Sequence, residues 1–318
     1  MILRYTVTDA DVGKTAEDVI RKRLCVSASL VKRVKHEAGI TVFGEVVFSN
    51  YVVKRGDELA VDTSVSEPSC GNLPEDGELD ILFENEGLLA VNKSSGILVH
   101  PSHSRNAGTL SNFVAGYLLR NSGVGCCHAV NRLDRDTSGV VLFAKNSHMK
   151  ARGARALAAV DAKKEYLAIV AGVLGPEKGV LDRPIKRLRE RDLLRVCADD
   201  GQRAVTHYET AAVLDVGSKT VSLLKLWLET GRTHQIRVHM LSAGHPILGD
   251  KLYYTEDSRA VSEALRIQTQ ALHAGKLSFF EPLSGEYMTV SAAPPDTFDI
   301  FAKNNRLERY FNIDIAFG

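Results

Sequence analysis

The sequence predicts an α+β protein with a largely antiparallel sheet, preceded by a small separate α/β module. Three observations support this prediction. Short β-prone runs and helical runs both occur, but they lack the regular alternation that a doubly wound parallel fold requires. A stretch rich in Ser, Pro and Gly at residues 64–79 indicates a linker. The patterns on its two sides differ, so we expect one module at residues 1–63 and a larger domain at residues 80–318.

The first module is expected to contain two short helices followed by short strands. Apolar residues recur at helical spacing in residues 16–24 and again in residues 30–38. Ser27 can cap the second helix, whose inner face would end at Ala38, and Gly39 can stop it. The β-prone runs that follow are residues 40–43, 46–48, 51–53 and 59–61.

A cluster of cations lies on this predicted pair of helices. A solvated helix face is the ordinary explanation for such a cluster. However, the order of elements resembles the alpha-L RNA-binding motif over most of residues 12–62. It consists of two short helices, the second of them basic, then Gly-Ile-Thr-Val-Phe-Gly-Glu-Val-Val and a closing Lys-Arg-Gly-Asp-Glu-Leu. On that resemblance, the RNA-binding candidates are Lys22, Arg23, Lys32, Arg33 and Lys35.

The larger domain mixes strands and helices. Its strands are expected at residues 81–83, 88–91, 140–144, 166–170 and 221–228. An Ala-rich segment at residues 150–160 favours a helix.

Composition excludes several classes of protein. Hydrophobic residues make up 44% of the 318 residues, charged residues 25%, and the formal net charge is +1, so a nucleic-acid surface would need locally clustered cations. The five Cys form no Cys-x-x-Cys pair, which argues against a disulfide framework or a thiolate zinc site. No run approaches the roughly 18 apolar residues of a membrane helix, and the first residues do not resemble a signal peptide. We therefore expect a cytoplasmic protein.

The most informative segment is residues 131–139, Asn-Arg-Leu-Asp-Arg-Asp-Thr-Ser-Gly, directly before an apolar run. Asp134 lies between two arginines, for which a surface ion pair is the ordinary explanation. A carboxylate that cations hold at the edge of a buried strand also suits nucleophilic chemistry. His234 and His239 are five residues apart and lack the acidic neighbour of a zinc helix, so we predict no metal site.

Three further segments gather polar residues beside predicted strands, namely residues 91–101, 163–172 and 230–250. Together with residues 131–139 they resemble, in order and approximate spacing, the RluA-type family of pseudouridine synthases. The family signature His-Arg-Leu-Asp-x-x-Thr-Ser-Gly is matched except at Asn131, which stands where His is expected. The resemblance implies an isomerase that converts uridine in RNA to its carbon-linked isomer, with no cofactor and no metal. Large-subunit ribosomal RNA is the implied substrate, transfer RNA is an alternative, and a monomer is the default.

The resemblance also implies a role for individual residues. Asp134 would be the catalytic aspartate, Arg237 the arginine that pairs with it, and Tyr166 the tyrosine that stacks on the target base. Arg132 is expected to fill the space that the flipped nucleotide vacates or to hold a phosphate. Lys93 is expected to support the site structurally.

A second group of cations lies in residues 183–195. We expect this segment to contact the RNA backbone, with Arg187 and Arg189 as candidates.

Two other functions stay open at this point. A catalytically silent RNA-binding factor of ribosome assembly would keep the fold but has no need for Asp134, Tyr166 and Arg237 together. A nucleoside glycosidase would normally use two carboxylates, and only Asp134 has a convincing setting. Whether Asp134 attacks the sugar, attacks the pyrimidine ring or helps to form a dehydrated sugar intermediate is not decided by the sequence.

Overall fold

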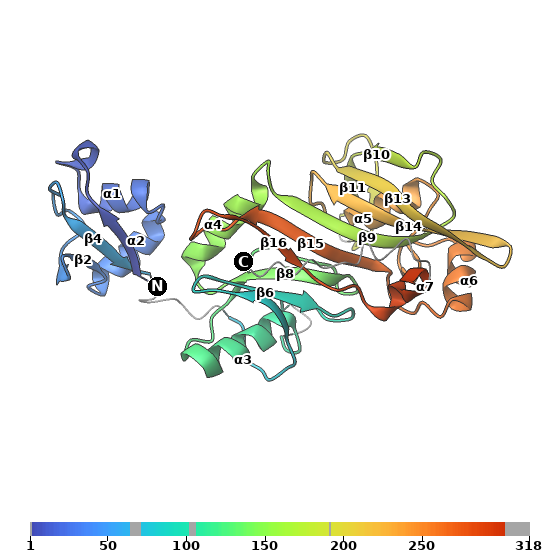
Figure 1. Ribbon diagram of the computed structural model, residues 1–318, viewed down its shortest axis with the longest axis horizontal. Coiled ribbons are helices and arrows are strands. Elements are labelled where there is room, and N and C mark those ends of the chain that lie inside the picture. The colour runs from blue at the N-terminus through green and yellow to red at the C-terminus, as the bar shows by residue number, and fades with distance from the viewer. Residues whose placement is uncertain (1, 64–70, 102–105, 191, 303–318) are drawn as a thin grey trace.

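The computed structural model describes residues 2–63, 71–101, 106–190 and 192–302. Figure 1 shows a small N-terminal module at one end of an elongated molecule and a larger domain that forms the remainder. None of the helices in the described ranges has the length and apolar character needed to cross a membrane.

The N-terminal module packs two helices on a four-stranded antiparallel sheet with the order β1-β4-β2-β3. The strands and helices are β1 (Ile2–Thr6), α1 (Ala16–Arg23), α2 (Ala28–His36), β2 (Ile40–Val42), β3 (Glu45–Val46) and β4 (Glu58–Asp62), with a short 3-10 turn, η1 (Asp9–Asp11), after β1. Thr15 caps α1 and Ser27 caps α2, the latter as predicted, because each side-chain oxygen accepts a hydrogen bond from a backbone N–H of the first turn. The module has its own buried core, with Ile20, Leu30 and Leu59 at its centre.

Two predictions for this module were wrong in detail, and one strand was missed. Residues 51–53 form no strand, only an isolated bridge between Thr15 and Val52. Ala38 is exposed with a φ of 56°, so it ends α2 rather than joining the inner face. The strand β1 was not predicted at all, because its burial alternates over only five residues.

The larger domain is built on one ten-stranded sheet with the order β10-β13-β14-β9-β15-β8-β6-β5, to which β16 and β7 add at β15 and β8. All of its pairings are antiparallel except that of β8 with β15. This confirms the predicted fold class. The sheet strands are β5 (Asp80–Glu84), β6 (Leu88–Lys93), β7 (His128–Ala129), β8 (Ser138–Ala144), β9 (Lys163–Ala171), β10 (Lys178–Asp182), β13 (Val205–Val216), β14 (Lys219–Leu228), β15 (Leu272–Phe280) and β16 (Tyr287–Ser291).

The other elements surround this sheet. A separate hairpin pairs β11 with β12. These elements are α3 (Leu110–Ser122), α4 (Ser147–Ala158), β11 (Ile185–Arg187), β12 (Arg195–Cys197), α5 (Gln235–Ser242), α6 (Glu256–Ala264), η2 (Asp296–Phe298) and α7 (Asp299–Ala302). The predicted helix at residues 150–160 begins earlier, at Ser147, and ends before Val160, which is fully exposed.

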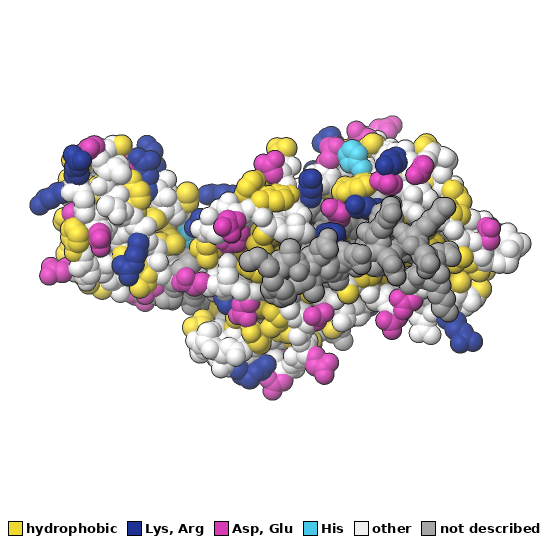
Figure 2. All heavy atoms as spheres, viewed as in Figure 1, with side chains coloured by type: hydrophobic (Ala, Val, Ile, Leu, Met, Phe, Trp, Pro, Cys, Tyr) yellow, Lys and Arg dark blue, Asp and Glu magenta, His cyan; other side chains and the backbone are white. Residues whose placement is uncertain are grey.

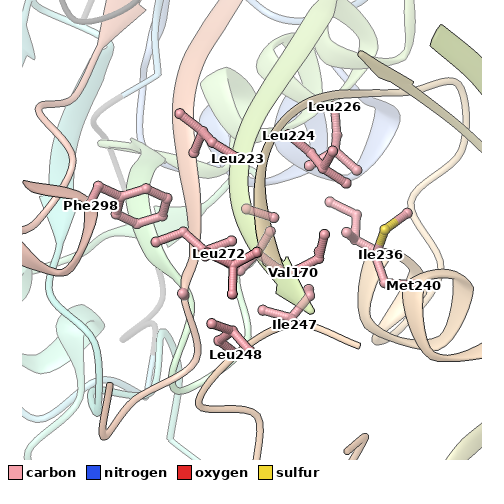
Figure 3. Packing of buried hydrophobic residues seen from close by; sticks show 14 of the residues in the cluster. Val170, Leu223, Leu224, Leu226, Ile236, Met240, Ile247, Leu248, Leu272 and Phe298 are labelled. Atoms are coloured by element: carbon pink, nitrogen blue, oxygen red, sulfur yellow. The ribbon is translucent and has the colours of Figure 1, made fainter. Parts of the chain in front are cut away.

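Strand β8 is buried on both faces, which explains its unbroken apolar sequence. Leu142 belongs to a core that includes Met149 of α4, whereas its neighbours Val141 and Phe143 belong to a core that includes Val114 of α3. The two helices thus cover opposite faces of β6 and β8. A third core fills the space between β9, β14 and α5 (Figure 3).

The parallel pairing of β15 with β8 determines the position of the motif loop, which is the loop before β8 that carries Asp134. Ala274 is opposite Gly139, whose φ is 115°. A Cβ atom at Gly139 would lie 2.2 Å from the Ala274 carbonyl oxygen, so only glycine allows the two backbones this close. The final glycine of the signature therefore seats the loop before β8 against β15.

The second half of the predicted linker packs on the larger domain. Residues 64–70 lie outside the described residues, but residues 71–79 pack on the larger domain. The backbone N–H of Glu75 donates to the Asn112 carbonyl at 3.0 Å, and Asn72 Nδ2 donates to the Cys127 carbonyl at 3.0 Å. This second half of the segment belongs to the packing around α3.

Candidate active site

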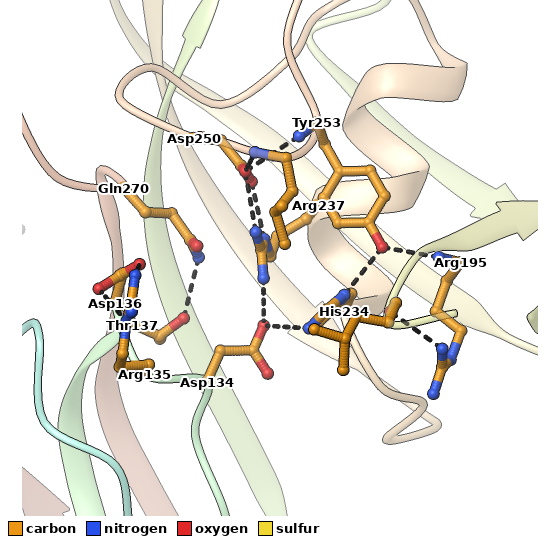
Figure 4. A network of polar contacts seen from close by, with 12 residues as sticks. Asp134, Arg135, Asp136, Thr137, Arg195, His234, Arg237, Asp250, Tyr253 and Gln270 are labelled. Carbon is orange, nitrogen blue, oxygen red and sulfur yellow. Dashed lines mark hydrogen bonds and ion pairs between the residues drawn. The ribbon is translucent and has the colours of Figure 1, made fainter. Parts of the chain in front are cut away.

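Asp134 lies in the loop between β7 and β8, and one of its two carboxylate oxygens is held (Figure 4). Arg237 Nη1 donates to Oδ2 at 3.0 Å, and His234 Nε2 lies 3.8 Å from the same oxygen. Within the described part of the chain, Oδ1 has no hydrogen-bond or ion-pair partner. The side chain is 27% exposed. One oxygen is thus anchored while the other is open to a bound molecule.

Arg237 comes from α5 and is held from its other side by Asp250. Its Nε and Nη2 atoms donate to the two Asp250 oxygens at 2.7 and 2.8 Å, and both side chains are buried. Asp250 also accepts the backbone N–H groups of Leu252 and Tyr253. Burial opposes the guanidinium charge, but the hydrogen bonds and charges of Asp250 and Asp134 outweigh it and raise the pKa of Arg237. The cation is therefore permanent and fixed in place.

Lys93 fixes the backbone of the motif loop from beneath. This fully buried side chain ends β6, and its Nζ donates to the carbonyls of Ser94, Ile97 and Arg135 at 2.8–2.9 Å. Burial lowers the pKa of Lys93 to about 8. Since one ammonium joins the turn after β6 to the residue after Asp134, Lys93 supports the site structurally, as predicted.

Asn131, which departs from the family signature, makes two hydrogen bonds to the backbone of β8. Its Nδ2 donates to the Val140 carbonyl at 3.1 Å, and its Oδ1 accepts the Leu142 N–H at 2.7 Å. The amide thereby holds the start of the loop on the strand that follows it.

Tyr166 lies half-buried on β9, which pairs with β14. Burial raises the pKa of its phenol, and the negative charge of Asp134 acts in the same direction. The phenol is therefore neutral near pH 7. Among the described residues, no hydrogen bond joins Tyr166 to Asp134.

Three residues of this site were not predicted, namely His234, Asp250 and Tyr253. The sequence drew attention to His234 only as a metal ligand. Its Nδ1 lies 2.8 Å from the Tyr253 hydroxyl, which receives the backbone N–H of Arg195 at 2.8 Å. His234 and Asp250 fall within residues 230–250, beside Arg237, whereas Tyr253 lies just beyond that segment.

Comparisons with known proteins identify the relatives of this chain. A family model described as RNA pseudouridylate synthase matches residues 87–242. An uncharacterized RNA pseudouridine synthase of Bacillus subtilis, YhcT, is 36% identical over 92% of this chain and 94% of its own. The ribosomal large subunit pseudouridine synthase D of Zymomonas mobilis is 36% identical over 87% of this chain and 91% of its own.

The chain belongs to the RNA pseudouridine synthase family. This confirms the resemblance to the RluA-type enzymes and identifies an isomerase of uridine in RNA. The fold agrees, because the solved structure of human RNA pseudouridylate synthase domain containing 1 superimposes with a TM-score of 0.56 at 24% identity, over 73% of this chain and 87% of that one. The alpha-L interpretation of the first module stays a prediction.

The synthase has two kinds of cation on its N-terminal module. Lys22, Lys32 and Lys35 are exposed, and Figure 2 shows Lys and Arg side chains distributed over this module. Arg23 is instead engaged with buried Asp11, to which its Nε and Nη2 donate at 2.9 and 3.0 Å.

Arg33 reaches the larger domain, where its Nη2 donates to Ser147 Oγ at 3.2 Å. A hollow of about 660 Å³ lies where the module meets α4. Its lining includes the cations Lys14, Arg21, Lys22 and Arg155 together with a single carboxylate, that of Asp18.

The predicted cations of the larger domain are also at the surface. Arg132, Arg187 and Arg189 are exposed, and Arg187 Nη1 donates to the Glu190 carbonyl at 3.0 Å. Arg132 is close enough to His100 for its charge, after burial, to lower the pKa of that imidazole. None of these three cations contacts the Asp134 carboxylate in the described chain.

Proposed function

We propose that this synthase isomerises specific uridines in structured RNA, most of all large-subunit ribosomal RNA, and that Asp134 is its catalytic carboxylate. The observation that supports this most is the unequal environment of the two Asp134 oxygens. Arg237 holds Oδ2 at 3.0 Å, whereas Oδ1 has no partner among the described residues. A reacting carboxylate needs both a fixed orientation and one free oxygen.

The proposed reaction loses no atoms. The bond between the sugar C1′ and the base N1 breaks, the base turns, and C1′ bonds to C5. The hydrogen on C5 leaves as a proton, and N1 gains one. Asp134 can serve this exchange by attacking C1′, by attacking the pyrimidine ring or by assisting a dehydrated sugar intermediate, and the same free oxygen serves each route.

Tyr166 supplies the aromatic surface for the extracted base in this proposal. A paired uridine hides its glycosidic bond, so the enzyme must take the base out of the stack. Stacking on an aromatic side chain contributes about 1–3 kcal/mol per base. Arg132, exposed two residues before Asp134, is suited to fill the vacated space or to hold the neighbouring phosphate.

Two features support ribosomal RNA as the substrate. Relatives such as that of Zymomonas mobilis are named as large-subunit enzymes. In addition, the exposed cations Lys22, Lys32 and Lys35 suit a structured RNA backbone, with Arg187 and Arg189 on the larger domain as a second contact. We propose that Arg23 and Arg33, which are engaged within the protein, shape this surface while adding positive charge to it. A monomer acting in the cytoplasm, where ribosomal RNA is found, completes the proposal.

Mapping of pseudouridine in total RNA from cells with and without the gene tests the substrate. We expect specific positions in large-subunit ribosomal RNA to lose the modification, and the purified protein to restore it in vitro. Changes confined to transfer RNA would favour that alternative substrate. RNA binding without any change in pseudouridine would identify a silent assembly factor, and release of free uracil would identify a glycosidase.

A further inference from the structure

Among the described residues, His234 is the titratable side chain beside Asp134 to which the proposed function gives no role. It is the residue before α5, and its side chain is only 13% exposed. Its two ring nitrogens face different partners. Nδ1 lies 2.8 Å from the Tyr253 hydroxyl, and Nε2 lies 3.8 Å from Asp134 Oδ2. Figure 4 shows the imidazole between the phenol and the carboxylate.

The hydrogen bonds around Tyr253 favour one of the two placements of the ring proton on His234. The backbone N–H of Arg195 donates to the phenol oxygen at 2.8 Å. The single proton of the phenol is then free to be donated to His234 Nδ1. Burial lowers the pKa of His234, against the charge of Asp134, so the ring is neutral near pH 7. A neutral ring that accepts at Nδ1 carries its proton on Nε2, which is the nitrogen that faces Asp134.

The backbone conformation of His234 indicates that surrounding residues hold the imidazole with Nε2 facing Asp134. Its φ of 59° and ψ of 19° lie in the left-handed region, which non-glycine residues avoid unless their surroundings hold them there. Those surroundings are rigid. Tyr253 is 3% exposed, and the Arg237 guanidinium carbon lies 4.9 Å from the centre of its ring.

We propose that His234 is a positioning residue that, with Arg237, fixes the rotation of the Asp134 carboxylate, and that Tyr253 anchors it. This inference rests on the proposed function of Asp134. Two donors aimed at Oδ2 leave Oδ1 as the oxygen that faces the substrate. The 3.8 Å separation is longer than a hydrogen bond, as is common before substrate closes a site. The backbone N–H that orients Tyr253 belongs to Arg195 of β12. A series of contacts therefore connects the hairpin of β11 and β12 with the Asp134 carboxylate, through Tyr253 and His234.

The variant His234→Asn separates this role from a structural one. Asn tolerates a positive φ, and its amide oxygen can still accept from Tyr253, but it is too short to reach Asp134. We expect the single-turnover rate at saturating RNA to fall about two- to tenfold, the size of one net hydrogen bond, with RNA affinity and thermal unfolding unchanged. His207→Asn, at a half-exposed side chain on β13 that pairs with Glu229, is the matched control and should keep the wild-type rate.

A double-mutant cycle with Tyr253→Phe completes the test. Phe keeps the ring over Arg237 and removes only the hydroxyl. We expect Tyr253→Phe to lower the rate when His234 is present but not in the His234→Asn background, because His234→Asn already removes the donor that Tyr253 orients. A wild-type rate for His234→Asn, a loss confined to RNA affinity, or additive losses in the cycle would overturn the assignment. Absence of pseudouridine formation by the wild-type enzyme would instead contradict the proposed function itself.

Discussion

At the scale of single residues, the site consists of one carboxylate with two different oxygens. Arg237 is central to it because it bridges Asp134 and Asp250 while buried. Removing one partner of a buried ion pair leaves an uncompensated charge. The same side chain that orients Asp134 therefore also stabilises the fold, through Asp250.

Replacing Arg237 with Met should lower the free energy of unfolding by about 3–5 kcal/mol, because Asp250 is left buried without its cation. Denaturant unfolding measures this. The matched control is Arg259→Met, whose ion pair with Glu263 is exposed on both sides and should contribute no more than about 1 kcal/mol. Equal stability of the two variants would show that the bridge to Asp250 does not support the fold.

The sequence contained most of the residues of this site but not their arrangement. Asp134 and Arg237 were predicted to pair, and their side chains do. The sequence did not predict the helical setting of Arg237. It also did not predict the roles of Asp250 and Tyr253, because hydrogen bonds between residues more than ten positions apart leave no local pattern in the sequence. His234 shows the same limit, since its left-handed backbone depends on tertiary contacts.

At the scale of elements, strand β8 and its neighbours decide where the chemistry lies. Its unbroken apolar run predicted a buried strand, as observed. Its parallel pairing with β15 was not predictable from local periodicity, because residue patterns do not specify which distant strand lies beside it. The hairpin of β11 and β12 was also not predicted, since its strands have only three residues each.

The buried His273 on β15 should make this strand pair sensitive to acid. It accepts a hydrogen bond from Ser138 Oγ on β8 at 2.9 Å and donates to the Ala292 carbonyl at 3.0 Å. Burial lowers its pKa to about 4, compared with about 6.5 in an unfolded chain. The unfolded state therefore binds the proton first, and the free energy of unfolding should fall as the pH drops from about 6.5 to about 4.

The expected loss from this one group is about 3 kcal/mol, at about 1.36 kcal/mol for each unit of pKa difference. The contribution of His273 is isolated by measuring unfolding at several pH values in the wild type and in His273→Gln. Burial also lowers the pKa of His148, but His148 is present in both proteins and contributes equally to both. An unchanged slope in His273→Gln would show that His273 does not titrate on unfolding.

At the scale of the whole molecule, a small module that carries cations on its two helices is attached to a larger domain that holds the Asp134 site. The module has its own core, and Arg33 connects it to α4. The domain division was predicted from composition, but the packing of residues 71–79 on α3 was not, because Ser, Pro and Gly indicate only the absence of regular structure.

Removing residues 1–63 should weaken RNA binding and flatten its dependence on salt, while the larger domain stays folded. Changing Lys22, Lys32 and Lys35 together to Gln in the full chain should lower the salt slope by up to about 2–3, since each phosphate contact contributes about 0.9 or less. Binding measured between low and moderate salt tests both variants. A slope equal to that of wild type would mean that these lysines are only solvated.

The central claim is that one carboxylate performs the isomerisation, and Asp134→Asn tests it most directly. The change keeps the size of the side chain and removes its charge. Pseudouridine formation should be abolished in an RNA that wild type modifies, while RNA binding and the folded state persist. Wild-type activity in that variant would contradict the account.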